Sequence, residues 1–293
     1  MKELNNLFTA TKIKKINNKY FINDCWHHRI IYNDNLKDDI YKWNTIDYKF
    51  SGCHTIASDG SIYVVDNTGM NEVIILDSDL KFIQKFINIG NRPHHVIYDE
   101  VTKKFYVVTA NSQEIYCFKN NNGVVEQCYS KKLDFLGYTR SITIIDGYMY
   151  FASADGHIYK TTYIDGSYSI VNAYNIPREF GGINQVYKIN DYYYVTIVGD
   201  INFSIDPRML RTKDLSTIEN NVYEDIYNTI GFTGEPYFIT EFDGGVYITE
   251  IGNAIAGIYS FEVDIDNNIK NINKKYKFTI NEKDFKIKNI FPL

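Results

Sequence analysis

The sequence repeats one phrase, in which a polar segment leads through a short apolar run and a turn into an aromatic-rich strand. The phrase reads HTIASDGSIYVV at residues 54–65 and SITIIDGYMYF at residues 141–151. One tyrosine keeps a fixed place in each copy, with spacings of 43, 44, 44 and 53 residues between Tyr63, Tyr106, Tyr150, Tyr194 and Tyr247. A period of roughly 40 to 50 residues built from strands and turns is typical of β-propellers, so the repeat predicts that fold.

Working outward from these tyrosines, we predict an all-β, six-bladed propeller with four antiparallel strands per blade, forming a single domain over residues 1–293. The predicted blades cover residues 10–50, 52–91, 93–136, 138–178, 182–231 and 234–280, and residues 281–293 form a C-terminal tail. The longest spacing predicts an insertion in the fifth blade, with a short helix over residues 222–230 that ends at Gly231. The first blade is the least regular, and its fourth strand is predicted at residues 40–43. Five or seven blades stay open as alternatives, because both ends of the chain depart from the repeat.

Composition and local pattern support the same fold class. Aromatic residues make up 16% of the chain, and aromatic side chains favour strands over helices. Apolar pairs such as Val64–Val65 and Val107–Val108 break the simple alternation of a half-buried strand. Strands buried on both faces lose that alternation, and the inner strands of packed blades are buried in this way.

Charge and targeting signals exclude several classes of partner. The chain carries 31 basic and 36 acidic residues, a net charge of -5, so we expect neither a nucleic-acid partner nor an anionic membrane. The N-terminus lacks the apolar stretch of a signal peptide, and no run reaches the roughly 20 apolar residues of a membrane span. We therefore expect a soluble, cytoplasmic protein with four reduced cysteines, and a secreted mature form stays open.

The repeat also predicts where a functional site would lie. In a propeller, the entries of the innermost strands and the loops between the second and third strands share one face around the axis. Aligning the blades on their tyrosines puts the following polar and aromatic residues on that face: Trp26, His28, His54, Asp66, His94, His95, Arg140, Gln185, Tyr237 and Glu250. The sequence therefore predicts a polar pocket at the axis.

Three kinds of site fit these residues. His54, His94 and His95 come from adjacent blades and would suit Zn²⁺ or Mn²⁺; the alternative is that they bond backbone groups at strand entries. His54, His95, Arg140 and Glu250 would suit acid–base catalysis with Arg140 as an anion clamp; the alternative is that Arg140 pairs with an acidic neighbour. Trp26, His28, His94, Gln185, Tyr237 and Asp66 would suit binding of a sugar or other small polar ligand.

Two segments carry a family resemblance. RPHHVIYD at residues 92–99 with FYVV at 105–108, and EPYFIT at 235–240 with VYITEIGNAI at 246–255, resemble NHL-type and YVTN-type propeller repeats. They are most similar to the virginiamycin B lyase-like group, and this resemblance implies a propeller with a pocket on one face. That group would place its general acid/base histidine where this chain has Tyr237, so we do not extend the lyase activity to this chain.

Together these patterns predict a propeller that binds a small polar or anionic ligand, such as a carbohydrate derivative, and that acts as a lyase or hydrolase if it is an enzyme. A non-catalytic platform for a protein partner is the alternative function.

Overall fold

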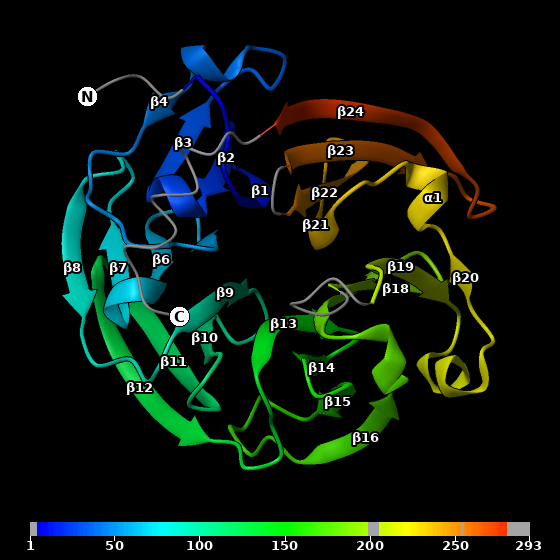
Figure 1. The fold of residues 1–293 in the computed structure, drawn as a ribbon. Coiled ribbons are helices and arrows are strands. Elements are labelled where there is room, and N and C mark those ends of the chain that lie inside the picture. The colour runs from blue at the N-terminus through cyan, green and yellow to red at the C-terminus, as the bar shows by residue number, and fades with distance from the viewer. Residues whose placement is uncertain (1–4, 199–204, 253–254, 280–293) are drawn as a thin grey trace.

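The computed structural model describes residues 5–198, 205–252 and 255–279, and in it six four-stranded sheets form a ring (Figure 1). In every sheet the strands pair in chain order, each antiparallel to the next. The predicted all-β, six-bladed propeller is therefore confirmed. The predicted tail at residues 281–293 lies outside the described residues.

The first three blades follow the predicted pattern from the axis outward. Blade 1 holds β1 (Ala10–Ile16), β2 (Lys19–Asp24), β3 (Arg29–Asn33) and β4 (Asn44–Thr45). Blade 2 holds β5 (Ile56–Ser58), β6 (Tyr63–Asn67), β7 (Glu72–Leu76) and β8 (Phe82–Phe86). Blade 3 holds β9 (Pro93–Asp99), β10 (Lys104–Thr109), β11 (Glu114–Asn121) and β12 (Val124–Lys132).

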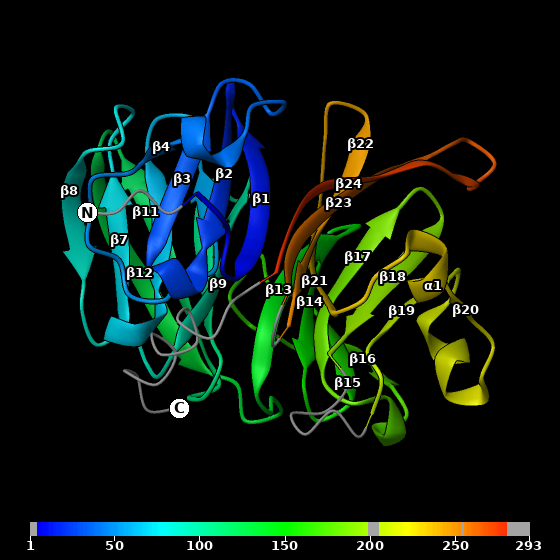
Figure 2. The ribbon, with the colours of Figure 1, turned by 45° about the horizontal axis from the view of Figure 1, so that its top comes forward.

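The other three blades complete the ring. Blade 4 holds β13 (Thr139–Ile145), β14 (Tyr148–Ser153), β15 (His157–Thr161) and β16 (Ile170–Asn175). Blade 5 holds β17 (Ile183–Ile189), β18 (Tyr192–Ile197), β19 (Arg208–Thr212) and β20 (Glu224–Asp225). Blade 6 holds β21 (Glu235–Phe242), β22 (Gly245–Ile251), β23 (Ile255–Val263) and β24 (Ile269–Thr279). In Figure 2 the innermost strands β1, β9 and β13 stand near the centre, and the innermost strands of neighbouring blades contact one another around the ring.

The fourth strand of blade 1 differs from the prediction. Residues Ile40–Lys42 form a 3₁₀ helix, and the outer strand β4 follows at Asn44–Thr45. Ile40 and Trp43 both pack into the cluster between blades 1 and 6. Residues three apart share a side of a 3₁₀ helix but point to opposite faces of a strand, so the burial of this pair favours the helix.

The helix of blade 5 is shorter than predicted. The helix α1 covers only Tyr227–Ile230, because Glu224–Asp225 pair with β19 as the outer strand β20. A six-residue 3₁₀ helix, Leu215–Asn220, precedes that strand. The predicted end is correct, since Gly231 follows the helix with a φ of 82°, a left-handed conformation that favours glycine.

The hydrophobic core lies between the blades. Each of the six interfaces between neighbouring blades holds its own cluster of buried apolar side chains. Val64 packs toward blade 3 and Val65 toward blade 1, while Val107 packs toward blade 2 and Val108 toward blade 4. The apolar pairs of the sequence are thus strands buried on both faces, as the broken alternation predicts.

A closed set of hydrogen bonds also joins the six blades near the axis. At each interface, a side chain on the first or second strand of one blade, or in the loop entering it, bonds a backbone group of the neighbouring blade, and we call this set the inter-blade belt. The bonds are Thr11 Oγ1 to His54 O (2.8 Å), Val96 N to Thr55 Oγ1 (2.8 Å), His94 Nδ1 to Arg140 O (2.9 Å), Ser141 Oγ to Asn184 O (2.7 Å), Thr196 Oγ1 to Tyr237 O (2.8 Å) and Thr249 Oγ1 to Thr11 O (2.8 Å). The last of these joins the final blade to the first and so closes the ring.

The described part of the chain has no helix long and apolar enough to cross a membrane. All four cysteines are free; Cys25, Cys53 and Cys117 are buried and Cys128 is exposed.

The closing bond of the belt is open to a direct test. Replacing Thr249 by Val keeps the shape of the side chain but removes its bond to Thr11 O and leaves Phe238 N, which donates to Thr249 Oγ1, without that acceptor. We expect Thr249→Val to lower the free energy of unfolding by about 1–3 kcal/mol, measured by urea denaturation. Thr45→Val, on an exposed strand, is the matched control and should change it by less than about 0.5 kcal/mol. Equal effects of the two variants would contradict a structural role for the belt.

Candidate functional site

A cavity of about 420 Å³ opens beside the axis, between the loops of blades 1, 2 and 3. Three predicted site residues line it, namely Trp26, His28 and His54. The other lining residues that matter for chemistry were not predicted from the sequence: Cys25, Asn71, Asn91, Arg92 and Asn111. The structure therefore puts the candidate site off the axis, at three consecutive blades.

Two loops of the same construction shape this cavity. The β2–β3 loop is the 3₁₀ turn Cys25–His27 followed by His28 with a φ of 53°. The β6–β7 loop is the 3₁₀ turn Thr68–Met70 followed by Asn71 with a φ of 52°. Asn tolerates the left-handed conformation well, and the His28 backbone is supported by its bond to Cys25 O and by Gly52 N, which donates to His28 Nδ1 at 3.0 Å.

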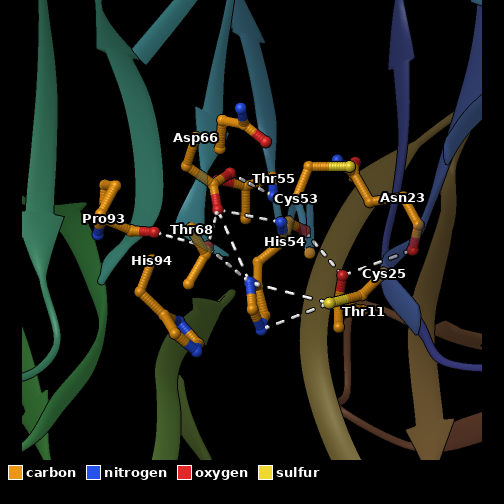
Figure 3. Close-up of polar contacts among 12 residues, drawn as sticks. Thr11, Asn23, Cys25, Cys53, His54, Thr55, Asp66, Thr68, Pro93 and His94 are labelled. Carbon is orange, nitrogen blue, oxygen red and sulfur yellow. Dashed lines mark hydrogen bonds and ion pairs between the residues drawn. The ribbon is translucent and has the colours of Figure 1, made fainter. Parts of the chain in front are cut away.

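His54 lies at the centre of the polar contacts around the cavity (Figure 3). Its Nδ1 is 2.9 Å from Thr68 Oγ1, and Thr68 Oγ1 donates to Pro93 O at 2.6 Å. Thr68 Oγ1 also lies 3.1 Å from Asp66 Oδ2. Because both Pro93 O and Asp66 Oδ2 can only accept, we assign the single hydroxyl proton to one of them and the proton of the His54–Thr68 bond to Nδ1. With the ring proton on Nδ1, it is Nε2 that offers the lone pair that a general base requires.

Cys25 lies against the His54 ring. Its Sγ is 3.6 Å from Nε2 and 3.9 Å from Nδ1, and these near-equal distances put the sulfur beside the ring, off the axis of either nitrogen lone pair. Burial raises the pKa of the Cys25 thiol well above its ordinary value, and the charges of Asp66 and Asp24 raise it further. Cys25 is therefore a protonated thiol that packs against the base.

The structure places His94 and His95 in the interior, away from the cavity. His94 Nδ1 donates to Arg140 O, and Tyr237 Oη lies 3.3 Å from His94 Nε2. The ring of His95 packs on Phe238, with centroids 4.8 Å apart, and neither His95 nitrogen has a hydrogen-bond partner among the described residues. Burial lowers the pKa of both imidazoles well below their ordinary value, so both rings are neutral.

The three histidines predicted as metal ligands have different neighbours in the structure. The rings of His54 and His94 stack with centroids 3.9 Å apart, while His95 turns to Phe238. Over residues 5–198, 205–252 and 255–279, no group of three His, Cys, Asp or Glu side chains is arranged to hold a metal ion. Binding of Zn²⁺ or Mn²⁺ at His54, His94 and His95 stays a prediction from the sequence, and the proposals below do not use it.

The two predicted carboxylates bond backbone groups of the loops that enter their own blades. Asp66 accepts from His54 N at 2.9 Å and Thr55 N at 2.5 Å, and Glu250 accepts from Thr233 N at 2.5 Å and Gly234 N at 2.7 Å. Both side chains are fully buried and neither lines the cavity. In blades 2 and 6, the carboxylate three residues after the repeated tyrosine is thus a clip that holds the strand entry.

The side chains of Arg140 and Gln185 also form hydrogen bonds with neighbouring blades. Arg140 Nη1 donates to Asn184 Oδ1 at 2.5 Å, and Gln185 Oε1 accepts from Ile239 N at 2.6 Å. Neither residue lines the cavity, so the predicted anion clamp at Arg140 is not part of the site that the structure forms.

Sequence analysis overlooked a buried lysine on the innermost strand of blade 1. Lys12 Nζ donates to Ile239 O at 3.0 Å and lies 5.4 Å from the centroid of the Phe238 ring. Burial, followed by the charge of Lys14, lowers the pKa of Lys12 from its ordinary value of 10.5 to about 7. The sequence feature that could have indicated this residue is a lysine within a strand that a propeller buries on both faces.

The lowered pKa of Lys12 predicts a pH-dependent stability. Between about pH 7 and 10 the unfolded chain binds a proton on Lys12 that the native state does not, so the stability of the wild type should rise with pH. We expect Lys12→Met to have a higher free energy of unfolding than the wild type at pH 6.5. The difference in free energy between the two proteins should be smaller at pH 9, as measured by urea denaturation at each pH. Lys81→Met, at an exposed position, should show no such narrowing. A pH-independent difference for Lys12→Met would contradict the assignment.

Comparison with known proteins gives a clear result for the fold alone. The sequence matches no protein-family profile and no curated protein. Among solved structures, a catalytically inactive virginiamycin B lyase from Staphylococcus aureus with quinupristin superposes with a TM-score of 0.60 at 18% identity, covering 96% of this chain and 88% of that one. A putative 6-phosphogluconolactonase from Bacteroides fragilis has a TM-score of 0.64 at 11% identity, covering 93% and 85%. The hydrazine synthase of Kuenenia stuttgartiensis has a TM-score of 0.63 at 15% identity, covering 86% and 77%.

The resemblance to the virginiamycin B lyase-like group is therefore confirmed at the level of the fold. At identities this low, structural likeness carries neither substrate nor mechanism. On this evidence the chain is a six-bladed β-propeller with the fold of these lyase-like and lactonase-like structures.

Proposed function

We propose that this protein binds a small polar or anionic molecule, such as a carbohydrate derivative, in the cavity between blades 1, 2 and 3. The observation that carries the proposal is the lining of that cavity. It combines the planar ring of Trp26, the amides of Asn71, Asn91 and Asn111, and the guanidinium of Arg92. A ring face that stacks on a sugar, next to amides that bond its hydroxyls, is the composition expected of such a pocket.

We also propose that His54 is the general base of this site, in a lyase or hydrolase reaction. Three observations support it: His54 lines the cavity, Thr68 fixes its Nδ1 as a donor, and its Nε2 keeps a lone pair. The names of two neighbours, a lyase and a lactonase, fit reactions that such a base serves.

We further propose that the protein is located in the cytoplasm.

The binding proposal can be tested with a cavity-filling variant. We expect saturation-transfer NMR with D-glucose, D-gluconate and 6-phosphogluconate to detect binding of at least one of them to the wild type. Asn111→Trp should abolish the signal, because the indole occupies the rim of the cavity. Asn121→Trp, at the far end of β11, makes the same change away from the cavity and should leave binding intact. Equal signals from the two variants would place the binding elsewhere.

The chemical state of His54 can be tested separately. Diethyl pyrocarbonate modifies an accessible, unprotonated ring nitrogen. We expect mass spectrometry to find carbethoxylation of His54 ahead of His94 and His95, because His54 lines the cavity and is 7% exposed, whereas the other two are 1% and 2% exposed and do not line it. His157, partly exposed, serves as the internal positive control. Modification of His157 without His54 would remove His54 as the base.

The alternative function is a platform for a protein partner. Phe82, Ile83 and Ile87 are exposed on and just after β8, the outer strand of blade 2, and support this alternative. The same NMR experiment separates the two functions. A wild type that binds none of the three small molecules, and that a protein partner protects at Ile83 in hydrogen exchange, would favour the platform.

A further inference from the structure

Arg92 differs from the other arginines that surround the cavity region. Arg29 Nε bonds Asp24 Oδ2 at 2.9 Å, and Arg140 Nη1 bonds Asn184 Oδ1. Among the described residues, the Arg92 guanidinium has no hydrogen-bond or ion-pair partner, although its Nε is buried. A buried donor on a charged group is costly unless something bonds it, so this guanidinium is built to meet a ligand or water.

The backbone at Arg92 is held in an unusual conformation. Its φ is 62°, a left-handed value that a non-glycine residue rarely adopts, and Pro93 follows directly. Two neighbouring segments hold it there: Arg92 N donates to Asn71 Oδ1 at 2.8 Å, and Ala110 N donates to Arg92 O at 2.8 Å. Strain of this kind persists where the surroundings impose it, and here it presents the arginine to the cavity.

No carboxylate in the cavity lining balances the positive charge of Arg92. No aspartate or glutamate lines the cavity. Asp24 and Asp66, whose charges act on the cavity-lining Cys25, are already engaged, Asp24 by His27 and Arg29 and Asp66 by the backbone of His54 and Thr55. The pKa of His94 is lowered by burial, then by His54, and also by the positive charge of Arg92.

We infer that Arg92 forms an anion subsite, which binds a carboxylate or phosphate group of the ligand. The inference rests on the proposed function and narrows its ligand to an anionic molecule. Arginine matches the planar, two-oxygen geometry of both anions. Asn91 and Asn111 line the cavity next to Arg92 and supply amide groups there. Asn111 Nδ2 donates to Asn91 Oδ1 at 3.5 Å. A cavity of about 420 Å³ has room for a sugar acid but not for a large polymer.

The test uses Arg92→Gly, because glycine accepts a φ of 62° and the variant should therefore fold. Arg92→Lys keeps the charge without the planar fork. Arg178→Met removes an exposed arginine from another cavity and is the matched control. Binding of D-gluconate, inorganic phosphate and neutral D-glucose is measured by isothermal titration calorimetry and by thermal shift, with the melting temperature of each apo variant as the check on folding.

We expect D-gluconate, inorganic phosphate or both to bind the wild type and Arg178→Met, and to bind Arg92→Gly at least tenfold more weakly, with Arg92→Lys in between. Binding of gluconate without phosphate would identify a carboxylate subsite, and binding of phosphate would identify a phosphate-compatible one. Equal anion affinity of the wild type and Arg92→Gly would overturn the inference. So would binding of D-glucose in both proteins with no effect of either anion, and that result would leave the proposed cavity standing. Absence of any anion effect on the wild type at tens of millimolar would also overturn it.

Discussion

The structure depends on closing a ring without a covalent bond between its ends. Every blade is one antiparallel sheet, so the ring holds only if each interface binds its two blades. Buried apolar clusters supply most of this attraction, and the inter-blade belt adds one directional bond at each interface. The belt joins residues as far apart in the chain as Thr11 and Thr249, and it uses polar side chains, mostly Thr and Ser, at the two inner strands of the blades.

This use of polar side chains determines where a site can form. Polar groups at the axis bond backbone atoms of the neighbouring blade, as His94 and Ser141 do. Carboxylates at the ends of the second strands bond the entering loops, as Asp66 and Glu250 do. The polar side chains that line the cavity belong instead to the loops of blades 1 to 3. The cavity therefore lies between these three blades and off the axis. His54 belongs to both regions, because its backbone joins the belt and clip while its ring lines the cavity.

Much of the fold could be predicted because the repeat is local. Strand, turn and strand follow one another within about a dozen residues, and patterns of apolar and turn residues over that range predict structure well. Prediction failed where tertiary contacts decide between local alternatives. The joint burial of Ile40 and Trp43 makes a 3₁₀ helix of a segment that reads as a strand. Of the residues predicted for the site, Trp26, His28 and His54 line the cavity. Arg92 was quoted only as part of a structural phrase, since nothing in its neighbours along the chain indicates its left-handed backbone or its lack of a partner.

The sequence by itself determined the period, the all-β propeller class and most of the strands, because these follow from spacing along the chain, whereas the closed ring of six blades was one of three alternatives that the sequence left open. Only the tertiary structure decided which polar residues are satisfied by the protein and which are left for a ligand. A hydrogen bond forms between groups that are close in space, and the partners here are commonly more than 40 residues apart, as His94 and Arg140 are. Nothing in the sequence distinguishes Arg140 from Arg92. In the structure Arg140 donates a hydrogen bond to Asn184, whereas Arg92 lines the cavity.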